Sequence, residues 1–121
     1  MPQREVVAYF FVPITEDSTI GNGELHPPFR WKFLQDAFFE AFEGLTVYPG
    51  ELAGIWKDSK TQKAVHDKSR KFEIHLEKRQ LPKLRALLRQ VALTFVQQTI
   101  CAVIDGKPEY QTPEANDEPL L

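Results

Sequence analysis

Residues 69–77 read SRKFEIHLE, and from residue 71 onward polar and apolar side chains alternate without a break. The apolar set is Phe72, Ile74 and Leu76, and the polar set is Lys71, Glu73, His75 and Glu77. A period of two is typical of a β-strand that buries one face and exposes the other. The stretch therefore predicts a strand over residues 64–77 whose apolar side packs on a core.

Two other segments are apolar on both alternating sets. Residues 4–14 read REVVAYFFVPI and residues 99–104 read TICAVI, and both are rich in β-branched or aromatic residues that favour strands. A strand that is apolar on both sides is expected to be covered on both sides. We therefore predict two strands whose second apolar face needs a cover.

Two segments have the period of a helix. In residues 29–44, FRWKFLQDAFFEAFEG, apolar side chains cover one broad side, and Gly44 is predicted to end the helix. A second helix is predicted from Pro82 to about Phe95, because proline is tolerated in a first helical turn and leucines recur on one stripe. Phe39 and Leu93 fall outside these stripes and are secondary candidates for contact with another molecule.

The remaining segments connect these elements into one order. Residues 15–28 read as a long loop, residues 45–58 as an extended segment bent at Pro49-Gly50, and Asp105-Gly106 as a turn. The order strand-helix-strand-strand-helix-strand predicts an α+β fold of the ferredoxin-like βαββαβ type. It would have a four-stranded antiparallel sheet in the order 4-1-3-2, with two helices on one face. We expect residues 1–111 to form this single domain and residues 112–121 to be a flexible acidic tail.

Composition restricts the class of protein. The chain has 121 residues, 42% of them hydrophobic and 26% charged, with a net charge of −2 and a single cysteine, Cys101. It shows no signal-peptide pattern and no apolar run long enough for a membrane span, so a cytoplasmic protein is predicted. The net charge makes nucleic acid an unexpected partner, although lysines between residues 57 and 71 leave an electrostatic alternative.

The apolar residues on the uncovered sheet face predict an interface. With both helices on one face, residues such as Val7, Tyr9 and Phe11 would lie on the face that meets water. An exposed apolar patch of that kind marks an interaction site, and two-fold symmetric dimers are the commonest assemblies. We therefore predict a homodimer, with cover by the 15–28 loop or the C-terminal tail as the alternative.

His75 is the main candidate for chemistry. It would lie on the open face with Glu73, and Tyr9 on the neighbouring strand could share that face. A histidine near a carboxylate and a phenol can act as a general acid or base near neutral pH. The simpler interpretation is a solvated strand face, because nothing else in the sequence converges on His75.

Motifs for metals, cofactors and nucleophiles are not found. His26, His66 and His75 lack paired-ligand spacing, and Cys101 has no basic neighbour that would activate it. The GNG of residues 21–23 is not part of a phosphate-binding motif. We predict no metal site and no cofactor.

Three short motifs carry a resemblance to a known family. The sequence contains GLTV at residues 44–47, GxWxD at residues 54–58 and FxQ at residues 95–97. In these motifs it resembles a family of small bacterial domains of unknown function, over residues 44–104. The resemblance implies a compact α+β domain and no particular activity. Physically, Gly54 would let the Trp56 indole approach the backbone, and Gln97 at a helix end could bond to carbonyl groups.

Two functions from different classes follow. The leading interpretation is a self-associating binding or interaction module without catalysis. The alternative is a small enzyme, or a small-molecule-binding dimer, that uses the open sheet face. In the alternative, His75 is the acid or base, Glu73 lies beside it, and Tyr9 and Trp56 line the ligand.

Overall fold

The alternating stretch lies in β4 (Ala64–Leu76), the longest strand of the computed structural model, as the sequence predicts. The structure describes residues 6–16, 23–57 and 60–120. Before β4 come β1 (Val6–Pro13), α1 (Pro28–Phe42), β2 (Thr46–Val47) and β3 (Leu52–Lys57). After it come a short 3-10 helix at Lys78–Gln80, then α2 (Leu81–Thr94), β5 (Ile100–Ile104) and β6 (Lys107–Gln111).

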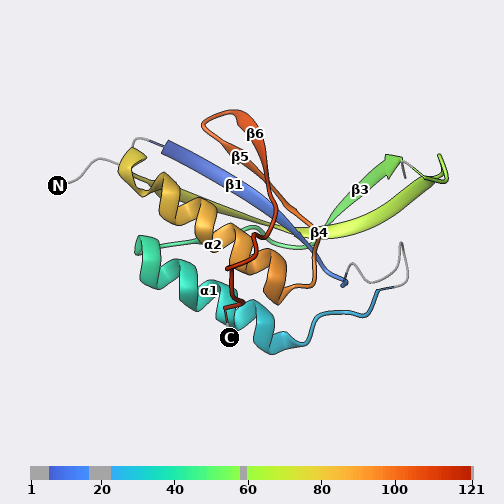
Figure 1. Ribbon diagram of the computed structural model, residues 1–121, viewed down its shortest axis with the longest axis horizontal. Coiled ribbons are helices and arrows are strands. Elements are labelled where there is room, and N and C mark those ends of the chain that lie inside the picture. Colours follow the sequence, from blue (N-terminus) through green and yellow to red (C-terminus); the bar gives the residue numbers. More distant parts are fainter. Residues whose placement is uncertain (1–5, 17–22, 58–59, 121) are drawn as a thin grey trace.

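The strands form one sheet in the order β2-β4-β1-β5-β6, and β3 also pairs with β4. All of these pairs are antiparallel. Both helices lie on the same side of the sheet (Figure 1). The α+β class is thus confirmed, and β1 and β4 are the central strands. The predicted four-stranded ferredoxin-like sheet is not confirmed in that form, because the described sheet has six strands.

Two backbone features account for the difference. Gly50 has a φ of +75°, which only glycine adopts easily, and it divides the predicted second strand into β2 and β3. β2 then pairs with the end of β4 at Phe72 and Glu73, whereas β3 pairs with its beginning. At Asp105-Gly106 the φ angles are +53° and +82°, as a tight hairpin turn requires, and the chain returns as β6.

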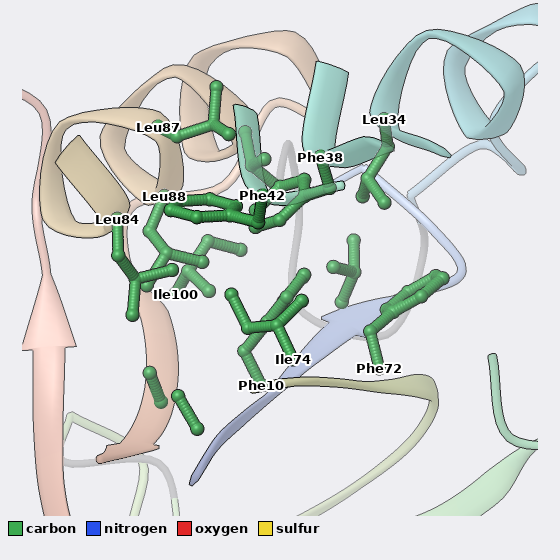
Figure 2. Close-up of a cluster of buried hydrophobic side chains, with 14 of the residues drawn as sticks. Phe10, Leu34, Phe38, Phe42, Phe72, Ile74, Leu84, Leu87, Leu88 and Ile100 are labelled. Atoms are coloured by element: carbon green, nitrogen blue, oxygen red, sulfur yellow. The ribbon is translucent and has the colours of Figure 1, made fainter. Parts of the chain in front are cut away.

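The core lies between the helices and the even-numbered residues of the central strands. Phe10 of β1 is fully buried. Its ring stacks on those of Phe38 in α1 and Phe72 in β4, with 4.9 Å and 5.2 Å between ring centroids. Figure 2 shows α1 and α2 directing Leu34, Phe38, Leu84 and Leu88 toward Phe10, Phe72 and Ile74. Large aromatic side chains of this kind dominate core energetics because each removes an extensive apolar area from water.

The end of α1 differs from expectation, and the chain after β6 has contacts that the sequence did not predict. α1 ends at Phe42, and the left-handed position that closes it is Glu43, with a φ of +64°, instead of Gly44. Residues 112–120, predicted as a flexible acidic tail, have specific contacts along α2. Asp117 pairs with Arg89 at 2.9 Å, and the backbone N–H of Leu120 donates to the Thr94 hydroxyl at 2.8 Å.

In the described part of the chain, no helix has the length and apolar character to cross a membrane.

Substitution of two adjacent phenylalanines tests the alternation of buried and less buried side chains along β1. We expect Phe10→Ala to lower the free energy of unfolding by about 3–5 kcal/mol, because it empties a fully packed site. Its matched control is Phe11→Ala on the opposite face, where the ring is only half-buried and the loss is expected to be about 1 kcal/mol. Urea unfolding followed by circular dichroism measures both, with Phe10→Leu in reserve if the alanine variant does not fold. Equal losses for the two positions would contradict the described face assignment.

Candidate functional site

The face of the sheet opposite the helices carries the odd-numbered residues of the central strands. The strand register sets Tyr9 opposite Glu73, Val7 opposite His75 and Phe11 opposite Lys71. Val7 on this face is 41% exposed in the single chain, so the described residues of the chain leave this position uncovered. We define the open face by Val7, Tyr9, Phe11, Lys71, Glu73 and His75, together with Tyr48, which follows β2.

Glu73 is at the centre of the polar contacts on the open face. Its Oε1 accepts a hydrogen bond from the Tyr48 hydroxyl at 2.8 Å, and its Oε2 accepts one from His75 Nε2 at 2.9 Å. The two donors come from different parts of the sheet, since His75 lies on β4 and Tyr48 follows β2. The backbone N–H of Tyr48 bonds to the Lys71 carbonyl oxygen, which holds Tyr48 beside β4. The carboxylate is therefore fixed in direction by two donors, which is how a sheet can hold a polar group in place for binding.

Lys71 lies between two aromatic rings on the open face. Its Nζ is 4.4 Å from the centroid of the Tyr9 ring and 4.4 Å from that of the Tyr48 ring. An ammonium group at this distance from a ring is attracted by the negative electrostatic potential of the ring face. Tyr9 also meets Phe11 edge-to-face, with 5.9 Å between centroids. Aromatic and charged groups thus share one small area.

The hydrogen bonds change the acidity of both acidic partners. The hydrogen bond from His75, and next the one from Tyr48, hold the pKa of Glu73 below its ordinary value. The bond to Glu73 raises the pKa of the Tyr48 hydroxyl, because ionised Tyr48 would lose the donated proton and repel the carboxylate. At neutral pH the open face therefore presents an ionised Glu73 and a protonated Tyr48.

The structure brings together three of the four predicted site residues. Tyr9, Glu73 and His75 lie on adjacent rows of the open face. Trp56 does not join them, because it pairs with Val65 at the other end of β4. At about 3.3 Å per residue, Val65 and His75 are roughly 30 Å apart along the strand. Tyr48 and Lys71 were missed as site residues, although Lys71 belongs to the same polar set as Glu73 and His75.

Glu77, the last residue of the polar set, has a structural role. It is buried, and its side chain and that of Gln80 cap the turn before α2 reciprocally. It also pairs with Arg79. Such a capping box satisfies backbone N–H groups at a helix start. Glu77 is therefore not part of the open face.

A second polar cluster lies on the helix side, where β1 ends and α1 begins. The buried His26 donates from Nε2 to the Pro13 carbonyl oxygen at 2.9 Å, so its Nδ1 is left to accept from Arg30 at 3.0 Å. Arg30 also pairs with Glu16 at 2.7 Å. Burial lowers the pKa of His26, which keeps the ring neutral. Both ring nitrogens of His26 have a partner on the chain, so we interpret the cluster as a structural clamp between the end of β1 and the start of α1.

The family motifs have structural contacts as well. Gln97 donates through Nε2 to the carbonyl oxygens of Thr15 and Phe95, as its position at a helix end predicts. A Cβ at Gly54 would lie 2.4 Å from Oδ1 of Asp67, so the glycine makes room for a carboxylate; the side chain of Trp56 lies outside the described part of the structure. Within residues 6–16, 23–57 and 60–120, no group of three or more histidine, cysteine or acidic residues is placed to hold a metal ion.

The comparison with known proteins gives similarities of structure. No protein-family model and no curated protein matches the sequence, so the resemblance to the small bacterial domains stays a prediction. The fold is similar to that of a phage SAM lyase in complex with S-methyl-5′-thioadenosine, with a TM-score of 0.65, 14% identity and 95% of each chain covered. It is also similar to a phage SAM lyase in the apo state, with a TM-score of 0.57, 16% identity, and 89% of this chain and 82% of that chain covered.

These similarities overturn the leading interpretation from the sequence. An interaction module without catalysis is contradicted, because the fold that the chain shares belongs to an enzyme. The alternative, a small enzyme or small-molecule-binding protein that uses the open face, agrees better with them. The sequence misled because a polar strand face that binds a ligand has the same alternation as one that only meets water.

The acidity of Glu73 provides a test of the site's geometry. We expect His75→Ala and Tyr48→Phe each to raise the pKa of Glu73, because each variant removes one donor to the carboxylate. Carbon-13 NMR of the Glu73 side chain across pH measures the shift. His66→Ala is the matched control, since His66 is an exposed histidine nearer the start of β4.

The lowered pKa of Glu73 also sets how the free energy of unfolding changes with pH. A carboxyl group with a lowered pKa in the folded state stabilises the fold above its unfolded pKa, and this stabilisation is lost as the pH falls through the folded-state pKa. Glu73→Gln should therefore flatten the acid side of the stability profile. An unchanged Glu73 pKa in both His75→Ala and Tyr48→Phe would contradict the described contacts.

Proposed function

We propose that the chain is a small enzyme that cleaves S-adenosylmethionine on its open face and releases S-methyl-5′-thioadenosine. The observation that carries this proposal is the similarity to the ligand-bound phage SAM lyase over 95% of both chains. A likeness over 95% of this chain includes its sheet and both helices. The cluster around Glu73 gives the open face the polar groups that such a ligand needs.

The chemistry of the substrate sets what the site must do. Its sulfur carries a positive charge and three carbon substituents. When the bond from sulfur to the amino-acid chain breaks, both bonding electrons stay on sulfur, which becomes the neutral thioether of S-methyl-5′-thioadenosine. In the same step the amino-acid fragment either forms a bond from its own carboxylate to the carbon that loses sulfur, or loses a proton from the adjacent carbon to a base, with the C–H electrons forming the new double bond. Neither route needs a proton on the leaving sulfur.

Glu73 is suited to binding the positively charged substrate. Its carboxylate is ionised at neutral pH and is held by Tyr48 and His75. The charge on sulfur disappears as the bond breaks, so attraction to a carboxylate is stronger in the ground state than in the transition state. An interaction of this kind lowers KM without raising kcat. Glu73 would therefore be a binding group.

His75 has the position of an acid–base group. Its side chain is 53% exposed, and its Nε2 is tied to Glu73 at 2.9 Å. If the amino-acid fragment loses a proton, the imidazole of His75 is a base on the open face that can accept it. In that route, loss of His75 lowers kcat.

A single sheet face supplies only one wall of a ligand site. Ligand sites bury most of the ligand surface, so the open face needs a second wall. The predicted homodimer remains part of this proposal, because a second chain would cover the exposed Val7 and close the site. A cytoplasmic location, as predicted from the sequence, belongs to the same proposal.

Release of S-methyl-5′-thioadenosine from S-adenosylmethionine tests the proposed function. We expect the purified chain to release it, as measured by liquid chromatography. Glu73→Gln should raise KM roughly tenfold without lowering kcat, the size of effect typical of one charged contact. His75→Ala should lower kcat if a proton is removed, and His66→Ala is the matched histidine control.

The fragment that leaves with S-methyl-5′-thioadenosine identifies the route: a lactone means carboxylate attack and an unsaturated amino acid means proton loss. The solution mass of the same samples by light scattering tests the dimer, for which twice the chain mass is expected. Absence of S-methyl-5′-thioadenosine from the folded wild-type chain would contradict the proposed function.

A further inference from the structure

We propose that the rings of Tyr9 and Tyr48 form a binding site for an onium cation, and that the Lys71 ammonium occupies this site until a ligand displaces it. This inference rests on the proposed function in that the sulfonium of the substrate would be the natural ligand. The site itself is defined by the rings, the lysine and the neighbouring Glu73.

The geometry of the rings already is that of a cation site. Nζ of Lys71 is 4.4 Å from both ring centroids, which is within the range of favourable cation–π contact for each. The rings come from opposite sides of β4. Tyr9 lies on β1 and pairs with Glu73, and Tyr48 bonds through its backbone N–H to Lys71. The backbone thus fixes the positions from which both tyrosines leave the sheet, and side-chain contacts to Glu73 and Phe11 hold their rings, whereas the lysine reaches them on a flexible stem.

A fixed anion lies beside the rings. The Tyr48 hydroxyl donates to Glu73 at 2.8 Å, so one ring and the carboxylate are joined directly. The hydrogen bonds that keep the pKa of Glu73 low keep this charge present at neutral pH. Two ring faces and a carboxylate favour a cation and disfavour an anion. The chemistry of the ligand therefore is that of a positively charged group.

The Lys71 ammonium competes with a cationic ligand for the position between the Tyr9 and Tyr48 rings. An ammonium group is strongly hydrated and carries three donors, and the lysine stem has several rotatable bonds, so the group can return to water from an exposed face. A sulfonium or quaternary ammonium ion has no N–H or O–H donors, so it gives up less hydration when it enters the rings. Exchange of Lys71 for the ligand keeps one positive charge between Tyr9 and Tyr48 throughout.

The test uses the trimethylsulfonium ion as a probe, alongside S-adenosylmethionine and its neutral analogue S-adenosylhomocysteine. Binding is measured by NMR titration of the folded chain. Lys71→Met keeps most of the stem and removes the internal cation, so we expect it to bind trimethylsulfonium roughly three- to tenfold more tightly than the wild type. Tyr48→Leu should weaken binding by a similar factor, whereas Tyr48→Phe, which keeps the ring, should retain the preference for the charged ligand.

Matched controls come from the edge strand β6. Lys107→Met and Tyr110→Leu change the same residue types at exposed positions outside the open face, and both should bind like the wild type. Equal binding of S-adenosylmethionine and S-adenosylhomocysteine, together with no gain in Lys71→Met, would overturn the inference. If trimethylsulfonium binds as expected but S-adenosylmethionine is not cleaved, the cation site stands and the proposed lyase activity fails. If S-adenosylmethionine is cleaved but Lys71→Met and Tyr48→Leu bind like the wild type, the cation site fails and the proposed activity stands.

Discussion

The antiparallel pairing of β1 with β4 fixes what each side of the sheet contains. Phe10 pairs with Phe72 and Ala8 with Ile74, so both strands direct their even-numbered residues to the helices. Tyr9 pairs with Glu73, and the odd-numbered residues form the open face. A slip of one residue would place Glu73 in the core and Phe72 in water. Burial of the phenylalanines against α1 and α2 therefore holds the site residues in register as well.

A site built on central strands differs from one built on loops. Tyr9 and Glu73 lie on neighbouring strands whose partners are fixed on both sides. Tyr48 joins them because β2 pairs with the end of β4, and the kink at Gly50 sends the chain away after that contact. Side chains on rigid elements keep their direction, which favours binding of one kind of charged group. A sheet face alone leaves one side of a bound ligand in water, which is why we propose that a second chain covers the ligand.

The period-two and helical patterns made much of the fold predictable. They identified β4 and both helices, because the sides of these elements differ strongly in polarity, whereas β1 and β5 were identified by their β-branched and aromatic residues. The six-stranded sheet was not predictable in the same way. β2 has only two residues, and β6 contains Pro108, which favours an edge position over a central strand. The contacts of Asp117 and Leu120 come from pairing across distant segments, which sequence pattern does not reveal.

For the site, alternation placed Glu73 and His75 on one face, and the expected neighbouring strand added Tyr9. Tyr48 depends on the register of a very short strand, and Trp56 was misplaced because the bend at Gly50 separates it from the others. The most direct test of the whole account is an amide NMR titration of the chain with S-methyl-5′-thioadenosine. If the open face is the ligand site, the shifts are largest at Tyr9, Tyr48, Lys71, Glu73 and His75. Shifts confined to the His26 and Arg30 cluster on the helix side, or no shifts at all, would contradict it.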